Sequence, residues 1–567
     1  MRTGVPSGGQ VLRKAIAGQR RVVAASSVFG AGHQGGEAMV PILIGVIIDR
    51  AVATGAIGEL ISWILVLAVV FVALSFSFRF AARTAVRAVE QAAHAIRIQL
   101  TERILDPGGG AQTGRLSGAL VNIATEDAKR VGAVNLALPK GIAALTALLV
   151  SAVALLSVSI PLGLLVLLGT PPLLGLAHLL GKPLERRTEV EQECAGQASG
   201  TAADLVTGLR VLKGIGAEAA AVARYRHISQ DSLVAALRTA RAHAWHDGTI
   251  FALTGVFIAV VALVGGRLAA QGDISIGELV AAVGLAQFLM SPLSQFSVVN
   301  SELAQARASA IRIASVLAAP PAVTPGTTRL PDSICGRIWL RGVWHAGLRD
   351  VDIDIAAGEM VGVVAPAPAV AIALLECLGR DADPTAGSVE LDGVALANVH
   401  LSDVRAAILV ATHDADLFEG SLIDNVTAAV SSAVGSTGVE RALSAAAVDE
   451  VARSLPDGVD TMIAERGRSL SGGQRQRVAL ARALATDPPV LLVHDPTTAV
   501  DTVTEARIAA GIREVRRGRT TIMVTTSPAL LAVTDRVVML DGGAVAVEGR
   551  HADLVHEHAG YRAAVLS

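Results

Sequence analysis

The sequence predicts a chain of two parts, an all-α membrane domain followed by an α/β domain. Of its 567 residues, 52 % are hydrophobic and only 17 % are charged, a balance typical of a membrane protein. Long uncharged runs crowd into the first half, whereas from about residue 333 onward β-like apolar runs alternate with helical patterns. A proline-rich stretch separates the two patterns. We therefore expect a membrane domain at 1–318, a linker at 319–332 and an α/β domain at 333–567.

The uncharged runs predict six membrane helices. Residues 60–78 carry no charge and are long enough to cross a bilayer core. Residues 141–181 contain no Asp, Glu, Lys or Arg, which is too long for one span, and Pro161 predicts a tight outer turn between two. The first span is less clean because it contains His33 and Glu37. The expected spans lie at roughly 22–48, 60–84, 135–158, 162–181, 246–268 and 278–300.

Lysine and arginine are concentrated in two long polar segments, at about 79–134 and 182–245. The positive-inside rule then places the N-terminus, both segments and the α/β domain in the cytoplasm. Helical periodicity predicts that the membrane helices continue into the cytosol as long extensions. The net charge of −2 gives no indication of a nucleic-acid partner. Abundant Ala, Val and Gly indicate a high-GC bacterium, and thus a cytoplasmic (inner) membrane.

The strongest motif is LSGGQRQRVALARAL at 470–484. Gly472 and Gly473 open a strongly helical segment, where free N–H groups and the positive helix end favour an anion. Ser471 can donate a side-chain hydrogen bond, and glycine lets the backbone approach closely. Alone, this start could be an ordinary helix cap. It is followed, however, by VLLVHDPTTAVD at 490–501, which is typical of a buried strand with an acidic end.

With these motifs the chain resembles the ATP-binding cassette transporters of the exporter-like (type IV) fold over nearly its whole length. Its LSGGQ matches the family's signature, and residues 383–393 and 417–426 follow the family pattern. Residues 114–131 and 207–225 resemble the two coupling regions, and Glu465 lies in a loop, TMIAERG, like the one that touches them. The resemblance implies six membrane helices fused to a P-loop-type α/β nucleotide-binding domain that uses ATP and Mg²⁺.

The phosphate loop departs from the family pattern. Family members have glycines there, followed by a lysine and a Mg-binding Ser or Thr. Each charge-assisted hydrogen bond from this loop to the phosphates is worth roughly 1.5–3 kcal/mol. Here the prolines also remove N–H donors. Aligned without gaps from Gly358, the three glycines become Ala365, Pro368 and Val370, the lysine becomes Ala371, and the Ser or Thr becomes Ile372.

Other positions of the same site are also altered. The family's Asp-Glu pair is His494-Asp495, so a histidine replaces the metal-anchoring aspartate and a shorter carboxylate replaces the catalytic glutamate. The switch histidine aligns with Thr526, and the Q-loop glutamine with His413. Trp344 is the nearest candidate for the aromatic that stacks on adenine.

Two further groups of residues leave alternatives. One alternative is a metal site formed by His413 and His494 with the nearby Asp414, Asp416 and Asp495. Residues that replace the ligands of a site that no longer functions are more often solvated or locally hydrogen-bonded. We therefore expect no metal. Glu37 and His33 in the first span could form part of a substrate or proton path, or Glu37 could simply face a wet cavity.

The resemblance implies a partner, since each ATP in this family lies between one subunit's Walker motifs and the other subunit's signature. We expect a heterodimer in which a homologue with intact Walker motifs binds ATP and Mg²⁺. This chain would be inactive alone, and segments near 106–118 and 207–217 would couple domain closure to the membrane helices. We expect export of a lipophilic or amphipathic cargo, because the spans contain few aromatic residues. The alternatives are a siderophore-type importer with exporter architecture and a non-transporting regulatory subunit. The residues lent to the partner's ATP would be Ser471, Gly472, Gly473, Gln474 and Asp501.

Overall fold

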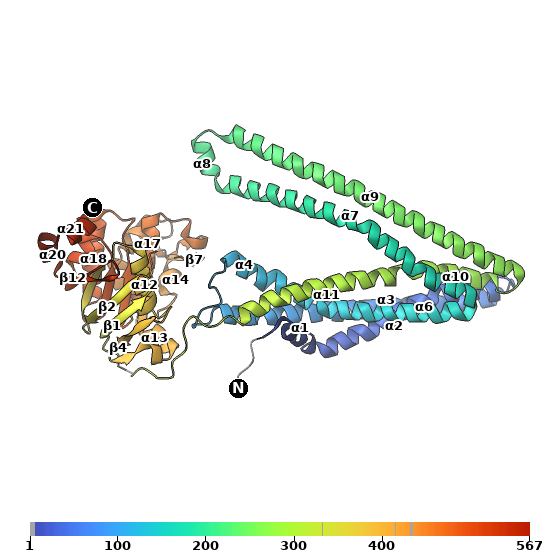
Figure 1. The fold of residues 1–567 in the computed structure, drawn as a ribbon, viewed down its shortest axis with the longest axis horizontal. Coiled ribbons are helices and arrows are strands. Elements are labelled where there is room, and N and C mark those ends of the chain that lie inside the picture. The colour runs from blue at the N-terminus through green and yellow to red at the C-terminus, as the bar shows by residue number, and fades with distance from the viewer. Residues whose placement is uncertain (1–5, 332, 414–415, 431–434, 567) are drawn as a thin grey trace. The chain divides into compact units, whose positions relative to one another are not determined.

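The computed structural model describes residues 6–331, 333–413, 416–430 and 435–566. The chain divides into two compact units (Figure 1). The first contains Met1–Thr101 and Leu116–Ala318, and the second contains Glu102–Arg115 and Ala319–Ser567. A short piece of the sequence's first half, 102–115, therefore belongs with the second unit.

The first unit is helical throughout its described elements. Uncharged segments form helices because only a helix or a closed barrel satisfies every backbone group inside a bilayer. Two single π-turns, η1 (Ile48–Val52) and η2 (Ile123–Asp127), interrupt the α-helices. The α-helices are α1 (Gly8–Ala17), α2 (Arg20–Ile47), α3 (Ile57–Ile104), α4 (Ser117–Asn122), α5 (Ala128–Gly132), α6 (Val134–Val158), α7 (Ile160–Thr207), α8 (Leu209–Gly214), α9 (Glu218–Gln271), α10 (Ile276–Phe288) and α11 (Met290–Leu317).

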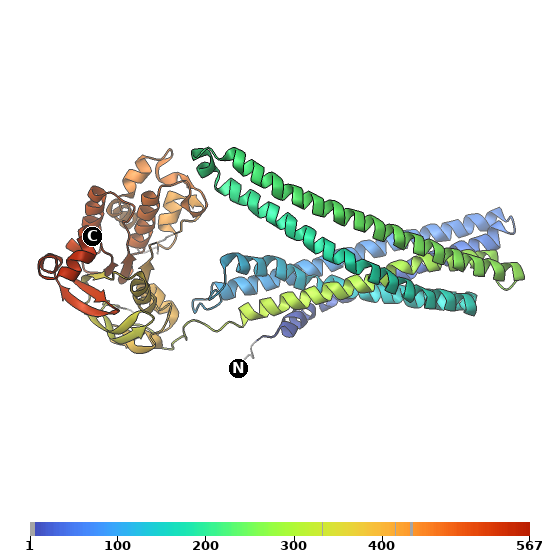
Figure 2. The same ribbon diagram turned by 45° about the horizontal axis from the view of Figure 1, so that its top comes forward.

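The longest helices run well beyond the uncharged segments, as the sequence predicts. α7 and α9 lie side by side, and the short α8 joins their polar ends (Figures 1 and 2). The outer turn between α6 and α7 is the single extended residue Ser159, and Pro161 lies in the first turn of α7. α9 ends at Gly272, whose φ of +82° is the left-handed conformation that glycine adopts without strain.

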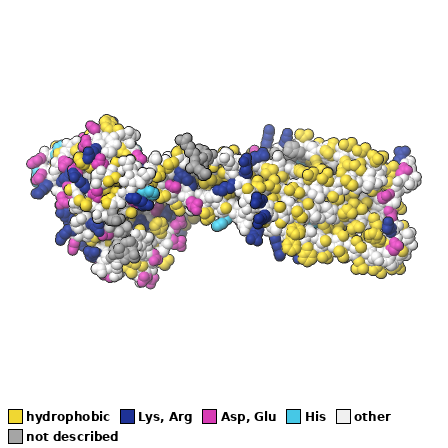
Figure 3. Space-filling view, turned by 90° about the horizontal axis from the view of Figure 1, so that it is seen from below, with side chains coloured by type: hydrophobic (Ala, Val, Ile, Leu, Met, Phe, Trp, Pro, Cys, Tyr) yellow, Lys and Arg dark blue, Asp and Glu magenta, His cyan; other side chains and the backbone are white. Residues whose placement is uncertain are grey.

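Five stretches of the described residues are long and apolar enough to cross a membrane, so the count of six is not confirmed. α2, the first expected span, is not among them. Its middle reads FGAGHQGGE, where glycines and polar residues lower the hydropathy. Hydrophobic side chains nevertheless cover much of the face of this unit in Figure 3. The five stretches are Ile57–Ile104, Ser117–Val158, Ile160–Thr207, Glu218–Gln271 and Ile276–Leu317.

The second unit has a six-stranded sheet of order β12-β11-β3-β10-β9-β6, parallel except for β12. A four-stranded antiparallel sheet, β2-β1-β4-β5, packs its apolar face into the same core as α12. The strands are β1 (Ile338–His345), β2 (Leu348–Ile355), β3 (Met360–Val364), β4 (Ala386–Leu391), β5 (Val394–Ala395), β6 (Ile408–Ala411), β7 (Gly420–Ser421), β8 (Met462–Ile463), β9 (Val490–His494), β10 (Thr520–Val524), β11 (Arg536–Asp541) and β12 (Ala544–Gly549).

Helices flank the six-stranded sheet and form a second apolar core with it. Because the strands are parallel, their carboxyl ends lie at one edge, where ligands bind in open α/β sheets. The α-helices are α12 (Pro368–Leu378), α13 (Leu401–Ala407), α14 (Leu422–Thr427), α15 (Gly435–Ala445), α16 (Val448–Arg453), α17 (Gly472–Thr486), α18 (Thr502–Val515), α19 (Pro528–Ala532), α20 (His551–Glu557) and α21 (Ala559–Leu566), and short 3₁₀ turns are η3 (Leu396–Asn398), η4 (Gly458–Asp460) and η5 (Glu465–Gly467).

Candidate functional site

The loop between β3 and α12 forms one half of the candidate site. β3 is buried along its whole length between two parallel neighbours. α12 begins at Pro368, whose fixed φ suits the first helical position, and its N-cap Ala367 has no side-chain cap. The chain thus keeps the strand–loop–helix turn that presents helix N–H groups to a phosphate. Pro366 and Pro368 have no N–H to present.

The side chains at this turn are apolar. Val370 and Ala371 are packed in the hydrophobic core and are only 6 % and 3 % exposed. Ile372 points outward at 50 % exposure and offers no oxygen to a metal, and Ala365 adds only a methyl group. Trp344, at the end of β1, is 45 % exposed. A triphosphate with Mg²⁺ therefore does not fit the residues of this loop, because none supplies an ammonium, hydroxyl or carboxylate group.

The ends of β9 and β6 bring together three of the predicted positions. His494 Nε2 lies 3.7 Å from Asp495 Oδ2, and the His494 and His413 ring centroids are 6.1 Å apart. His413 Nδ1 lies 3.4 Å from the Asp495 carbonyl oxygen, across 82 residues of sequence. Among the described residues, no three His, Cys, Asp or Glu side chains gather as a metal site would need. Asp414 lies outside the described residues, and the exposed Asp416 lines the same hollow as the two histidines.

Burial lowers the pKa of His494, and although the nearby Asp495 opposes this shift, the pKa stays below the ordinary value of 6.5. The unfolded chain therefore takes up this proton at a higher pH than the folded chain. His494 contributes its stability in full above about pH 6.5, and this is lost as the pH falls. We expect the full-length chain's melting temperature to drop between about pH 7.5 and pH 5.5, and to drop less in His494→Asn. Equal drops in the two proteins, measured by thermal unfolding in detergent, would show that His494 is not a source of the decline.

The end of β10 carries the predicted switch position, Thr526, which is exposed. Its neighbour Ser527 donates to Glu505 Oε1 at 2.8 Å, and Thr497 donates to the same oxygen at 2.6 Å. Glu505 therefore ties the loop after β9 to the loop after β10. Sequence reasoning did not single out Glu505, because it lies on α18 outside the recognisable motifs.

The signature segment has the geometry of an open helix N-terminus. Ser471 is the N-cap of α17: its Oγ accepts from Gln474 N at 3.3 Å, and Gln474 Oε1 accepts from Ser471 N at 2.8 Å. Ser471 is exposed, so its hydroxyl proton is available to a ligand. The N–H groups of Gly472 and Gly473, in the first turn, have no intrahelical acceptor. This helix end fits an anion, in contrast to the start of α12.

Gly473 is required by a close backbone contact. A Cβ at this position would lie 2.4 Å from the Ala499 carbonyl oxygen, a separation that real side chains do not adopt. The signature helix thus rests directly on the TTAVD segment. Asp501 caps α18 by accepting from Val503 N at 3.1 Å and Thr504 N at 2.9 Å. These hydrogen bonds, chiefly from Thr504, hold the pKa of Asp501 below its ordinary value, so it is a carboxylate at neutral pH.

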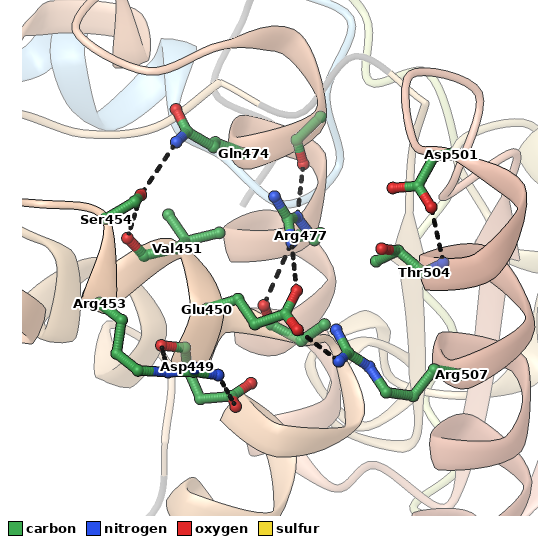
Figure 4. Close-up of polar contacts among 12 residues, drawn as sticks. Asp449, Glu450, Val451, Arg453, Ser454, Gln474, Arg477, Asp501, Thr504 and Arg507 are labelled. Atoms are coloured by element: carbon green, nitrogen blue, oxygen red, sulfur yellow. Dashed lines mark hydrogen bonds and ion pairs between the residues drawn. The ribbon is translucent and has the colours of Figure 1, made fainter.

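A polar network behind the signature was not predicted from the sequence (Figure 4). Glu450, on α16, pairs with Arg507 at 2.5 Å and with Arg477 at 3.6 Å. Arg477 also donates to the Gly473 carbonyl at 3.3 Å, and Gln474 Nε2 lies 3.4 Å from Ser454 Oγ. The network joins α16, α17 and α18, so it fixes the direction in which the N-terminus of α17 points. The sequence alone does not predict this network, because its residues lie on helices that are far apart in the sequence.

The expected coupling residues are partly located. Glu465 is exposed in η5, and 207–217 contains α8. The first coupling segment joins the second unit through hydrogen bonds. Arg103 donates to the Gly109 carbonyl at 2.9 Å and the Ala319 carbonyl at 2.8 Å, and Ala322 N donates to the Gly108 carbonyl at 2.8 Å. These hydrogen bonds tie the segment to the linker, and Arg103, which lies outside the recognisable motifs, provides two of them.

Glu37, the possible path residue, lies in the first unit on α2. His33 Nε2 is 3.8 Å from its Oε2, and His33 Nδ1 is 3.0 Å from the Leu74 carbonyl oxygen. His33 and Gln34 line a cavity of about 320 Å³ whose walls are mostly apolar. The Gln34 Oε1 atom is buried and has no hydrogen-bond partner among the described residues. Glu37 is thus engaged with His33, which fits either of the two interpretations.

Comparison with known proteins agrees with this architecture. Residues 23–293 match the family described as ABC transporter transmembrane region, and residues 348–498 match the family described as ABC transporter. An ATP-dependent lipid A-core flippase from Cupriavidus pinatubonensis is 31 % identical over 395 residues, which are 68 % of this chain and 67 % of that protein. A solved bacterial Atm1-family ABC exporter with ATP bound has a TM-score of 0.74 and 22 % identity, and the match covers 98 % of each chain.

A multidrug efflux ATP-binding/permease protein from Mycobacterium tuberculosis is 31 % identical over 456 residues. The match covers 79 % of this chain but only 38 % of that longer relative. Two family matches in order along the chain, and a relative matched over two thirds of its length, agree with the fold. The chain belongs to the ABC transporter family, with a membrane domain and a nucleotide-binding domain fused in one polypeptide of the exporter fold.

Proposed function

We propose that this chain is the degenerate subunit of a heterodimeric ABC transporter. The observation that carries the proposal is the contrast between two helix starts in one domain. α12 begins with prolines and buried apolar side chains, whereas α17 presents an exposed serine and two open glycine N–H groups. A chain that had lost nucleotide chemistry altogether would have no need to keep the second.

A partner subunit completes the site in this proposal. The partner, a homologue with intact Walker motifs, supplies the lysine, the Mg²⁺ ligands, the catalytic glutamate and the switch histidine. This chain supplies the N-terminal end of α17 and the carboxylate of Asp501, the last residue of the TTAVD segment. ATP, with Mg²⁺, is the nucleotide that the domain family implies, and its binding provides the free energy for closing the two domains. The contributing residues are Ser471, Gly472, Gly473, Gln474 and Asp501.

We further propose that α2 is the sixth membrane span. It packs against α6 and α10, both of which belong to the apolar stretches, so its polar middle faces protein on at least part of its circumference. A polar span is tolerated when neighbouring helices shield it from lipid. With six spans the N-terminus and the nucleotide-binding domain share the cytoplasmic side, as the distribution of Lys and Arg requires. The membrane would be the bacterial cytoplasmic membrane.

We propose that the transporter exports a lipophilic or amphipathic compound. The first unit exposes large apolar side chains along its membrane helices, and its cavity beside α2 has mostly apolar walls. Relatives named for lipid A-core flipping and for multidrug efflux support the same class of cargo. These names describe those proteins, and the assignment to this chain rests on the apolar lining.

Transport by inside-out vesicles tests the proposed function. We expect vesicles from cells that contain both subunits to accumulate a lipophilic dye when ATP is supplied outside, because their nucleotide domains face outward. Vesicles lacking this chain should accumulate only the background amount. Accumulation that persists without this chain would contradict a transport role and favour a regulatory one. Uptake seen only in right-side-out vesicles would contradict export.

A further inference from the structure

Four arginines converge on a groove between α7 and α9. Arg186 and Arg187 come from α7, Arg238 and Arg241 come from α9, and the hollow between them measures about 470 Å³. The buried residues Ala235 and Thr239 form its floor, and Thr239 Oγ1 donates to the Arg187 carbonyl at 3.2 Å, which holds the two helices together. We call this set of four side chains the arginine groove.

The arginine groove carries four positive charges that lack a partner among the described side chains. Among the side chains that the structure describes, none of the four guanidinium groups forms an ion pair or hydrogen bond. Arginines elsewhere are paired, such as Arg312 with Asp127 and Arg337 with Asp354. Four like charges around one hollow repel one another, so an anion in the hollow would stabilise the arrangement.

The arginine groove lies just beyond the ends of the apolar runs. Arg186 and Arg187 follow Lys182, the first charge after the uncharged part of α7, by four and five residues, about 6–8 Å of helix. Arg241 precedes the uncharged part of α9, which starts at Gly248, by about 10 Å of helix. Arg186 and Arg187 therefore lie at the depth of the headgroup layer, which spans about 5–8 Å on each side of the bilayer core. Arg241 lies at the outer edge of this layer and Arg238 lies about 15 Å of helix from Gly248, so both approach the headgroups from the cytoplasmic side.

We propose that the arginine groove binds the phosphate-bearing headgroup of an anionic lipid from the cytoplasmic leaflet. Guanidinium groups bind phosphate oxygens in pairs, and basic pockets between membrane helices on the cytoplasmic side suit such headgroups. The positive-inside rule accounts for arginine at this depth, but not for its convergence from two helices on one hollow. Arg83 and Arg87, exposed on α3, have the same charge without lining this groove. The proposal rests on the membrane orientation given above and is independent of the heterodimer.

Native mass spectrometry of the full-length protein with phosphatidylglycerol tests the proposal. Because each basic residue near an anionic surface contributes about fivefold in affinity, Arg238→Gln/Arg241→Gln should bind the lipid about 25-fold more weakly. The matched double variant Arg83→Gln/Arg87→Gln should bind within about twofold of the unmodified protein. Arg238→Lys/Arg241→Lys, which keeps the charge, should retain most of the affinity and shows that a loss does not come from misfolding.

Three outcomes would overturn the assignment. Equal losses in the two glutamine variants would place the lipid elsewhere on the basic belt. Equal binding of phosphatidylglycerol and the zwitterionic phosphatidylcholine would exclude recognition of anionic lipid. Displacement of the lipid by inorganic phosphate at equal concentration would identify soluble phosphate as the ligand. None of these measurements depends on ATP or on the partner subunit, so a failure of the heterodimer proposal would leave them unchanged.

Discussion

Purified without a partner, the chain is expected to hydrolyse ATP no faster than background. A homodimer would pair two intact signatures with two phosphate loops that offer no lysine, hydroxyl or full set of N–H donors. Each charge-assisted bond lost to the phosphates costs roughly 1.5–3 kcal/mol, so the loss of two lowers affinity by about 10²–10⁴-fold. Phosphate release should therefore fall at least about a hundredfold below that of the complete pair.

The control for this expectation is the heterodimer with the partner's Walker lysine replaced by alanine. It should be as inactive as the isolated chain, because the only complete site has been removed. Ile372→Ser in this chain restores a hydroxyl at a half-exposed position, and should leave the rate of the heterodimer unchanged. Appreciable turnover by the isolated chain, with no partner detectable in the preparation, would refute the division of roles.

Gly473→Ala is expected to abolish most of the heterodimer's ATPase activity. The new methyl group would lie 2.4 Å from the Ala499 carbonyl oxygen, so the start of α17 or the TTAVD segment must move. Either movement displaces the Gly472 and Gly473 N–H groups from the partner's nucleotide. By comparison with the loss of one preorganised backbone-type donor in other enzymes, the rate should fall about 10²–10³-fold.

The matched control for Gly473→Ala is Ile372→Ser, which lies on α12 of the same domain and replaces a half-exposed side chain with a smaller one. Both variants should retain the size of the pair on gel filtration and a cooperative thermal transition. A Gly473→Ala heterodimer that keeps its ATPase rate would show that this chain's signature does not serve the partner's site.

Sequence alone located those parts of the site that depend on local geometry. The N-cap at Ser471 and the buried strand before His494 follow from residue type at fixed spacing. The phase of α12 could not be predicted in the same way. Val370 and Ala371 face the core and Ile372 faces outward because of how α12 packs on the antiparallel sheet.

Features built from distant segments were also beyond the sequence. The Glu450 network needs three helices to meet, and the arginine groove needs α7 and α9 to present two arginines each to the same hollow. The attachment of 102–115 to the second unit depends on backbone hydrogen bonds such as that from Ala322 to Gly108. The count of six spans is not confirmed, because glycines and polar residues in the middle of α2 keep this helix out of the five apolar stretches.

The number of ATP molecules held by a closed heterodimer tests the central claim most directly. The pair is trapped with Mg²⁺ and radiolabelled ATP while the partner's catalytic glutamate is replaced by glutamine, and bound nucleotide is counted after gel filtration. Since this chain's phosphate loop does not fit a triphosphate, we expect one ATP per pair, cross-linkable to both the partner's Walker motifs and this chain's Ser471 region. Two ATP molecules per pair, with one cross-linked to the loop around Pro368, would contradict the claim.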